Sequence, residues 1–375
     1  MTTGTDTDRI HLARAVELAE QGRGRVSPNP LVGAVIARNG ESLGEGFHSA
    51  LGAPHAEVEA IRAAREAGSD PAGATLYVSL EPCCHSGLTP PCTDAILGAG
   101  LARVVFASDD PTEKASGRGL GILRDEGVEV VQGEGDLAAR ARGLNQPFRK
   151  HARTGRPWVL FKSAMSLDGK VATHLGDSKW ISSESSRRRA HRWRAELDAV
   201  AVGIGTALAD DPQLTSRGED VFRQPRRVVF DSTARLPLDS HLVRDAGDVP
   251  LTVIVSRAAP STEVAALEAA GAEVIVATGA NEPARIVSAL DQLGAAGVTS
   301  MLLEGGPRLA GAFLDAGEID QLRIFIAPLL VGARNARDPI EGEGVEAIDE
   351  AVRVLPLEAE NIEGDVLITA RLKEW

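Results

Sequence analysis

The sequence predicts an α/β protein built from two layered domains. Its 375 residues are long for one domain and comfortable for two. A composition of 43% hydrophobic and 25% charged residues is sufficient to bury ordinary cores. Strand-like and helix-like patterns alternate along the whole chain, which is typical of layered α/β folds.

The first half shows the order α-β-β-α-β-α-β-α-β. Residues 1–8 are expected to form a polar tail, and an amphipathic helix follows from Arg9 to a glycine stop. The pair Asn39-Gly40 lies between two strand-like runs and is a strong hairpin signal. The other expected helices are 58–66, 92–100 and 119–127, and the expected strands are 31–40, 42–48, 75–80, 104–108 and 128–133.

A basic, glycine-bearing segment separates the two halves and loses apolar periodicity after Leu144. We interpret its later part, residues 148–157, as a linker between a first domain (1–147) and a second domain (158–375). The alternative is a surface helix and loop that belong to the first domain, which would move the boundary only slightly.

The second half repeats the alternation of strands and helices, which predicts a second α/β domain. Expected strands are 157–166, 198–204, 226–231, 251–256, 272–278, 300–306 and 322–330, with 366–375 as a closing edge strand. Expected helices are 185–197, 262–271, 283–297 and 307–317.

One stretch of the first half predicts a metal site. It reads PHAE and, after a strand, EPCCHSGLTPPC, and it holds all three cysteines of the chain. The pattern H-x-E followed by P-C and a further Cys is the signature of zinc-dependent nucleobase deaminases. His55, Cys83 and Cys92 would bind the metal and leave one position to water, while Glu57 would move protons.

The spacing of His55 and Glu57 supports this interpretation. Residues two apart point to nearly opposite sides of a regular helix, so these two converge only at a helix entry, which Pro54 suits. A purely structural zinc site is the alternative, and it would more often be closed by a fourth Cys or His. Cys84 could be such a fourth ligand, or it could only be adjacent to Cys83 in the sequence. His85 could be a fourth ligand, could support one of the ligands, or could contact the substrate.

The composition of the chain limits which binding partners are expected. A net charge of −13 argues against nucleic acid, for which a basic stripe is expected, and favours a small-molecule substrate. Three clustered cysteines point to a reducing compartment, and no apolar run is long enough for a signal peptide or a membrane span. We therefore expect a soluble cytoplasmic protein without membrane contact. A homo-oligomer is a separate expectation, which composition does not establish.

Longer motifs then connect the chain to a known family. The first half contains SPNPLVGAVI, GFHSALGAPHAE and EPCCHSGLTPPC, and the second contains SLDGKVA, SKWIS, ALADDPQLTSR and LLEGGPRLAGAFL. With these motifs the chain resembles, over nearly its whole length, the bifunctional deaminase/reductase of riboflavin biosynthesis. The long gap from Cys83 to Cys92 is itself typical of that family. The resemblance implies a cytidine-deaminase-like layered domain followed by a dihydrofolate-reductase-like domain.

The resemblance also implies the chemistry. The first domain, with Zn2+, would hydrolyse an amine from 2,5-diamino-6-(5-phosphoribosylamino)pyrimidin-4(3H)-one. The second would use NADPH to reduce the ribosyl group of 5-amino-6-(5-phosphoribosylamino)uracil to a ribityl chain. The protein would thus be both a hydrolase and an NADP-dependent oxidoreductase.

Site residues carry over by position. The zinc ligands match His55, Cys83 and Cys92, the proton shuttle Glu57, and a pyrimidine contact Asn29. Positions that match contacts to the nicotinamide cofactor are Ala164, Trp180, Thr206, Asp210, Ser232, Gly306, Pro307, Arg308, Leu309, Ala310, Gly311 and Ala312. Positions that match contacts to the reductase substrate are Ser178, Arg194, Leu214, Arg217 and Glu304.

Physical reasoning on the second half is compatible with these matches. Gly305-Gly306-Pro307 after an apolar strand is a turn whose helix-start amides can meet a diphosphate, although such turns are common and this one is not G-x-G-x-x-G. Arginines crowd residues 187–194 in an otherwise acidic chain. Most would lie on a solvated helix face, but Arg194, with Arg217, is expected to clamp a substrate phosphate.

The chain departs from the family at two positions in deaminase loops. The family often has Lys or Arg where Leu88 stands, and Asn where Thr112 stands. Either a nearby basic residue such as Lys114 or Arg118 compensates, or the deaminase half is impaired and the reductase is the working half. Other hypotheses are a nucleic-acid editing deaminase with an accessory domain, which the acidic charge disfavours, and a regulatory module with a structural zinc.

Overall fold

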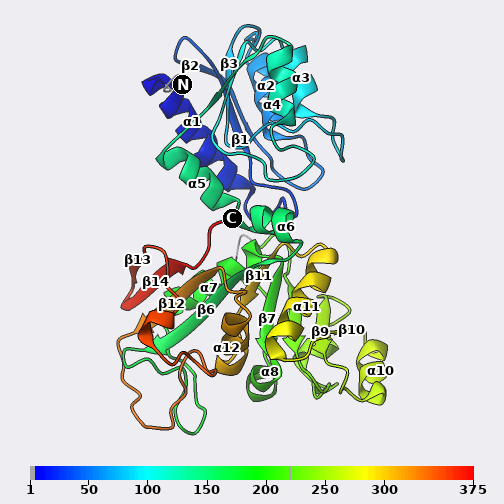
Figure 1. Cartoon of the computed structure of the whole chain (residues 1–375), viewed down its shortest axis with the longest axis vertical. Helices are drawn as coiled ribbons and strands as arrows, with labels where there is room; N and C mark the ends of the chain where they lie inside the picture. The colour runs from blue at the N-terminus through cyan, green and yellow to red at the C-terminus, as the bar shows by residue number, and fades with distance from the viewer. Residues whose placement is uncertain (1–4, 219–220) are drawn as a thin grey trace. The chain divides into compact units, whose positions relative to one another are not determined.

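The computed structural model describes residues 5–218 and 221–375, which divide into two compact units between Thr154 and Gly155 (Figure 1). Trp375 groups with the first unit. In the described ranges no helix is both long and apolar enough to cross a membrane.

The first unit is a three-layer α/β/α structure. Its sheet has the order β2-β1-β3-β4-β5, with β1 antiparallel to both neighbours and β3, β4 and β5 parallel. Apolar residues of α1 and α5 cover one face, and those of α2, α3 and α4 the other (Figure 1). The elements are α1 (Asp6–Ala19), η1 (Glu20–Gly22), β1 (Gly33–Arg38), β2 (Glu41–Phe47), α2 (Ala56–Glu66), β3 (Thr75–Val78), α3 (Cys92–Gly98), β4 (Arg103–Phe106), α4 (Arg118–Asp125), β5 (Glu129–Gln132), α5 (Asp136–Leu144) and α6 (Gln146–Thr154).

The expected hairpin and the order of the first nine elements are confirmed. Asn39 adopts the left-handed conformation, with φ of 54°, between β1 and β2, which pair Arg38 with Glu41. Helix α2 packs against β2 so closely that the backbones of the two elements are in contact. A Cβ on Gly46 would stand 2.5 Å from the amide nitrogen of Ala60 and 2.6 Å from the carbonyl of Ala56. This contact fixes the start of α2, where the motif PHAE lies.

The segment expected as a linker is largely helical. Residues 148–154 belong to α6, which the first unit includes, so the structure agrees here with the alternative, a helix of the first domain, and not with the interpretation of 148–157 as a linker. Apolar periodicity did not reveal the helix because its buried side includes Arg149 and Lys150. Arg149 is satisfied by the side chain and carbonyl of Asp109, so a cation occupies a position normally held by an apolar residue.

The polar tail expected over residues 1–8 is also corrected where the structure describes it. Thr5 caps α1 in a capping box with Asp8, and residues 1–4 lie outside the described ranges. The buried carboxylate of Asp8 accepts hydrogen bonds from Tyr77 at 2.9 Å and from Arg103 at 2.6 and 3.0 Å. It therefore fastens the start of α1 to β3 and β4.

The second unit contains one nine-stranded sheet in the order β10-β9-β8-β7-β11-β6-β12-β14-β13. The first seven strands run parallel to one another, β14 is antiparallel to β12, and β13 is antiparallel to β14. The elements are β6 (Trp158–Ser166), α7 (Glu184–Glu196), β7 (Ala199–Gly203), α8 (Ile204–Asp210), β8 (Arg226–Phe230), α9 (His241–Arg244), β9 (Leu251–Val255), α10 (Ser261–Ala269), β10 (Glu273–Val276), α11 (Glu282–Ala295), β11 (Ser300–Leu303), α12 (Pro307–Asp315), β12 (Gln321–Ala327), η2 (Ile348–Glu350), β13 (Glu358–Ile362) and β14 (Asp365–Arg371).

Helices cover both faces of this sheet. Apolar residues of α11 and α12 pack with one face of the sheet in a single core cluster. On α7, Trp193 stacks on Phe325 of β12 with ring centroids 5.4 Å apart. The closing strand is not the edge that we expected, because β14 pairs with β12 on one side and β13 on the other. The edge strand β13 reads EAENI, and its mostly exposed polar residues give no apolar strand signal.

We predict that Asp8→Asn lowers the free energy of unfolding by about 2–4 kcal/mol at neutral pH, because Arg103 loses its principal carboxylate. Burial alone would raise the pKa of Asp8, but hydrogen bonds from Arg103, Thr5 and Tyr77 hold this pKa well below its ordinary value of 3.8. The stabilisation is therefore complete above that ordinary value and is lost as the pH falls below it. Urea titrations should show the difference between variant and wild type narrowing below about pH 4.

The matched control is Asp6→Asn, since Asp6 is exposed in the same helical turn. An equal loss in both variants, or a loss for Asp8→Asn that does not change with pH, would contradict the role given to Asp8.

Candidate active sites

Three side chains that commonly bind metals meet in the first unit. His55 is the N-cap residue of α2, Cys83 follows β3, and Cys92 is the first residue of α3. His55 Nδ1 lies 3.2 Å from Cys92 Sγ and 3.5 Å from Cys83 Sγ. The candidate ligand atoms of the three residues all lie within 4.8 Å of one another.

This arrangement fits zinc. Tetrahedral coordination with Zn–N and Zn–S bonds of about 2.0–2.3 Å separates nitrogen and sulfur ligands by about 3.5 Å, close to the distances found here. His55 Nε2 lies 3.0 Å from Thr89 Oγ1, which orients the ring with Nδ1 toward the thiols. Hydrogen bonding with Cys92 and His55 lowers the pKa of Cys83 to about 4, so one thiolate forms readily.

The ligand set leaves a position open. In the described part of the chain no fourth Cys, His or carboxylate joins the group, and Cys84 Sγ instead lies 3.6 Å from the carbonyl of Lys114. Three protein ligands with an open position are characteristic of catalytic zinc, whereas structural sites are usually closed. The geometry therefore favours the catalytic interpretation.

Glu57 lies beside this group in the first turn of α2. Its side chain is buried, and it lines the same cavity as His55 and Cys83. Burial, followed by the negative charge of Cys83, raises the pKa of Glu57 to about 7. A carboxyl group with such a pKa can both accept and donate a proton near neutral pH.

His48 is a site residue that sequence reasoning missed. Its Nδ1 lies 3.1 Å from the carbonyl of Pro54, which only accepts hydrogen bonds, so Nδ1 carries the proton. Burial lowers the pKa of His48, which favours the neutral ring, and Nε2 therefore accepts from Asn29 Nδ2 at 3.1 Å. This bond fixes the amide of Asn29 and leaves its oxygen and second N–H for a ligand.

These residues line one cavity of about 520 Å³, a volume in the usual range for small-molecule sites. Both departures from the family pattern lie on its wall: Leu88, which is 79% exposed, and Thr112. Lys114 also lines the cavity, whereas Arg118 does not. Phe148 and Ala152 of α6 complete the wall, so the presumed linker contributes to the site.

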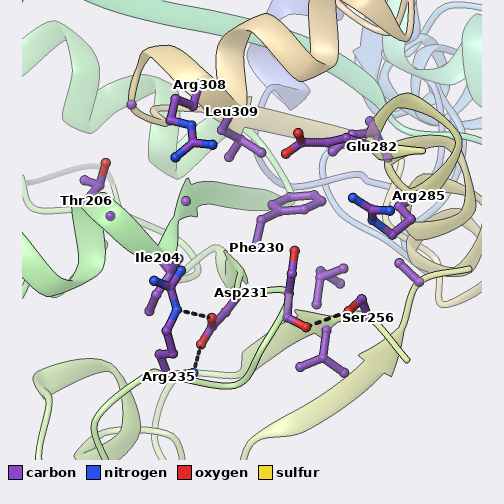
Figure 2. A pocket seen from close by; sticks show the side chains of 18 of the residues that line it. Ile204, Thr206, Phe230, Asp231, Arg235, Ser256, Glu282, Arg285, Arg308 and Leu309 are labelled. Carbon is purple, nitrogen blue, oxygen red and sulfur yellow. Dashed lines mark hydrogen bonds and ion pairs between the residues drawn. The ribbon is translucent and has the colours of Figure 1, made fainter. Parts of the chain in front are cut away.

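A second cavity, of about 340 Å³, lies in the second unit (Figure 2). It is formed at the ends of β7, β8 and β9 and by the first residues of α12. Thr206 and Arg308 line one part of it, and Ser256, Glu282 and Arg285 another (Figure 2). Helix α12 has Pro307 at its start, and a first-turn amide such as that of Arg308 has no acceptor within the helix, so an anion can be bound there.

A buried ion pair forms a separate polar cluster in the second unit. Arg194 of α7 donates through Nε and Nη2 to both oxygens of Glu304, at 2.7 and 2.8 Å, and through Nη1 to the carbonyl of Thr215. Burial would raise the pKa of Glu304, but the charge of Arg194 outweighs it and lowers this pKa to about 2. Burial also lowers the pKa of the nearby Lys162 on β6.

Comparisons with known proteins cover both units. Residues 5–108 match the cytidine and deoxycytidylate deaminase zinc-binding region, and residues 157–368 match the RibD C-terminal domain. The riboflavin biosynthesis protein RibD of Actinobacillus pleuropneumoniae is 43% identical over 364 residues, which are 97% of this chain and 95% of that protein. The chain belongs to the RibD family.

Solved RibD structures agree in fold. The deaminase/reductase of Thermotoga maritima and the RibD of Acinetobacter baumannii in its form 1 are each 35% identical with a TM-score of 0.84. Each match covers 97% of this chain and 98% of the other. The expected cytidine-deaminase-like and dihydrofolate-reductase-like domains, the cofactors Zn2+ and NADPH, and the bifunctional RibD activity are therefore confirmed.

The residues expected to contact the nicotinamide cofactor fall into two groups, according to whether they line the second cavity. Thr206, Ser232, Gly306, Pro307, Arg308 and Leu309 line the second cavity. Ala310, Gly311 and Ala312 do not: they are buried within α12, and a Cβ on Gly311 would stand 1.4 Å from the carbonyl of Glu341. Ala164, Trp180 and Asp210 also lie outside the cavity lining. Trp180 is 71% exposed beneath the guanidinium of Arg187, at 4.5 Å.

The RibD substrate positions are partly brought together. Arg194 and Glu304 bind each other, and Leu214 is buried beside Thr215, whose carbonyl Arg194 contacts. Arg217 is exposed and donates to Gln213, and within the described ranges no hydrogen bond or ion pair joins Ser178 to Arg194 or Glu304. The pairing changes the interpretation of Arg194, because three of its nitrogen atoms are already bonded within the protein.

We predict that Arg194→Ala lowers the free energy of unfolding by about 3 kcal/mol, because the buried carboxylate of Glu304 loses its partner. Without the guanidinium, burial raises the pKa of Glu304 above its ordinary value of 4.5. Glu304 then becomes protonated as the pH falls through the raised value. Reductase activity of the variant should therefore decline at acidic pH where wild type stays active.

Arg194→Lys should restore part of both effects, and Arg192→Ala is the matched control, since Arg192 is exposed on the same helix. Identical pH–rate profiles for wild type and Arg194→Ala would overturn the role of Arg194 as the partner that keeps Glu304 ionised.

Proposed function

We propose that the first unit deaminates 2,5-diamino-6-(5-phosphoribosylamino)pyrimidin-4(3H)-one and that the second reduces the ribosyl group of 5-amino-6-(5-phosphoribosylamino)uracil to ribityl. The observation that carries the deaminase assignment is the three-residue ligand set with Glu57 beside it in one cavity. The Thermotoga maritima relative is a diaminohydroxyphosphoribosylaminopyrimidine deaminase/5-amino-6-(5-phosphoribosylamino)uracil reductase, which supports the choice of substrates.

In the proposed deaminase, His55, Cys83 and Cys92 would hold zinc, which would supply an activated water for attack on the pyrimidine. Glu57, buried beside these ligands, would take up a proton and pass it to the departing amine, which would leave as ammonia. Asn29, held by His48, offers one acceptor and one donor to the edge of the pyrimidine ring. Thr89 keeps the His55 ring oriented.

In the proposed reductase, bound NADPH would supply the hydride that reduces C1′ of the ribosyl group. The first turn of α12, Arg308 and Thr206 bind the cofactor diphosphate. Arg217, which is exposed and donates to Gln213, is the candidate for the substrate phosphate, while Arg194 orients Glu304 toward the substrate. The protein thus contributes position and charge, and the redox chemistry belongs to the cofactor.

The cellular setting follows from these substrates. A small phosphorylated pyrimidine and a net charge of −13 are consistent with an enzyme that acts in the cytoplasm without nucleic acid. Homo-oligomer formation stays a prediction, to be checked by light scattering of the full chain.

The test of the two-site proposal is Glu57→Gln. This variant removes the proton carrier but keeps nearly the same size, so ammonia release should fall by at least about a hundredfold. Zinc content and NADPH oxidation with deaminated substrate should stay near wild type. Loss of both activities in this variant would contradict two independent sites.

A second prediction concerns the departures at Leu88 and Thr112. Lys114 lines the deaminase cavity, and its side chain can supply the charge that Leu88 lacks. Lys114→Ala should therefore lower deaminase kcat/KM about tenfold or more, and Leu88→Lys should gain little. Arg118→Ala is the control, because Arg118 lies outside the cavity lining.

The opposite result identifies an impaired deaminase. If Leu88→Lys alone raises kcat/KM about tenfold while Lys114→Ala is silent, the pocket binds its substrate weakly and compensation through Lys114 is wrong. The intact ligand set and the position of Lys114 favour the working deaminase.

A further inference from the structure

The cofactor cavity continues into a smaller polar pocket. Ser256, Ala277 and Arg285 line both, and Arg257, Ala258, Thr278 and Gly279 complete the smaller one. No carboxylate belongs to this lining in the described part of the chain, whereas the main cavity also carries Asp231 and Glu282. The smaller pocket, which we call the arginine pocket, therefore has two guanidinium groups and no opposing acid.

The two arginines of this pocket are available to a ligand. Among residues 5–218 and 221–375, neither Arg257 nor Arg285 has a hydrogen bond or ion pair through its side chain. Arg235 of the main cavity differs, because it forms an ion pair with Asp231 (Figure 2). Guanidinium groups suit phosphate because their N–H donors match its oxygens in pairs.

Close contacts fix the backbone segments that carry both arginines. A Cβ on Gly279 would stand 2.7 Å from Cβ of Ala284 and 2.8 Å from the amide nitrogen of Arg285, so the loop after β10 touches the first turns of α11. The hydroxyl of Ser256 donates to the carbonyl of Ser232 at 2.7 Å and accepts from the amide of Ala258 at 3.2 Å. The turn that carries Arg257 is thereby tied to the end of β8.

We propose that the arginine pocket binds the 2′-phosphate of the NADPH adenosine and so selects NADPH over NADH. The inference rests on the proposed reductase function. The first turn of α12 and Arg308 lie at a different part of the cavity and suit the diphosphate, which both dinucleotides share (Figure 2). The 2′-phosphate is the only group that NADPH adds, and an arginine beside the adenosine ribose is a known means of accommodating it.

The experiment measures binding to the full-length protein of two fragments that differ by the 2′-phosphate, 2′,5′-ADP and 5′-AMP. Arg285→Ala and Arg257→Ala should each weaken 2′,5′-ADP about tenfold or more and leave 5′-AMP unchanged, as expected for a lost charge-assisted contact. Arg285→Lys should recover part of the affinity. Arg244→Ala, an exposed arginine outside both pockets, is the control.

The kinetic readout is the ratio of KM values for NADH and NADPH, which should fall by the same factor in both alanine variants. The assignment would be overturned if the wild type prefers 2′,5′-ADP to 5′-AMP and a variant that combines Arg257→Ala with Arg285→Ala keeps the same preference. The proposed reductase function would not be affected by that result. A preference lost only in Arg235→Ala would assign the 2′-phosphate to Arg235 instead. A wild type that neither binds NADPH nor oxidises it would refute the proposed reductase itself.

Discussion

The deaminase site depends on how closely α2 lies against β2. Two glycines of β2, Gly44 and Gly46, face the small residues Ala56, Ala60 and Ala64 of the helix, and a Cβ on either glycine would overlap helix backbone. This contact sets the height of α2 above the sheet. His55 is the cap of that helix, and its ring must meet two cysteine sulfurs from other elements, so the position of one helix fixes the ligand set.

The same helix start explains why the site can hold charge. His55 and Cys92 both stand at helix N-termini, where unpaired amides and the helix dipole favour negative groups. At the start of α3 the amide of Cys92 donates to Cys83 Sγ at 3.4 Å, which favours the thiolate of Cys83, the form in which cysteine binds zinc. Two helices that begin at one end of the sheet thus bring the ligands together and prepare them for the metal. Glu57, in the first turn of α2, is buried by the same packing that places His55.

Sequence patterns predicted the alternation of elements because the buried residues of most strands and helices are apolar. They failed where a polar group is buried and paired. Asp8 looks like part of a polar tail, yet Arg103 and Tyr77 bind it in the interior. Arg149 is likewise buried and paired, with Asp109, so the helix that contains it has no apolar pattern in the sequence. Strand β13 is mostly exposed and polar, so it also lacks an apolar pattern. Motif spacing found the zinc ligands, whereas His48 acts through Asn29 and leaves no spacing signal.

The reductase half shows how an acidic chain can still bind phosphate. With a net charge of −13, its surface alone would repel an anionic cofactor. Several arginines are neutralised by carboxylates, as Arg194 is by Glu304 and Arg235 by Asp231, and these pairs hold the walls of the sites. The guanidinium groups of Arg257, Arg285 and Arg308 have no such partner within the described ranges. Attraction for phosphate in this cavity therefore comes from three arginines that line it, or its smaller extension, without a carboxylate partner in the part of the chain that the structure describes.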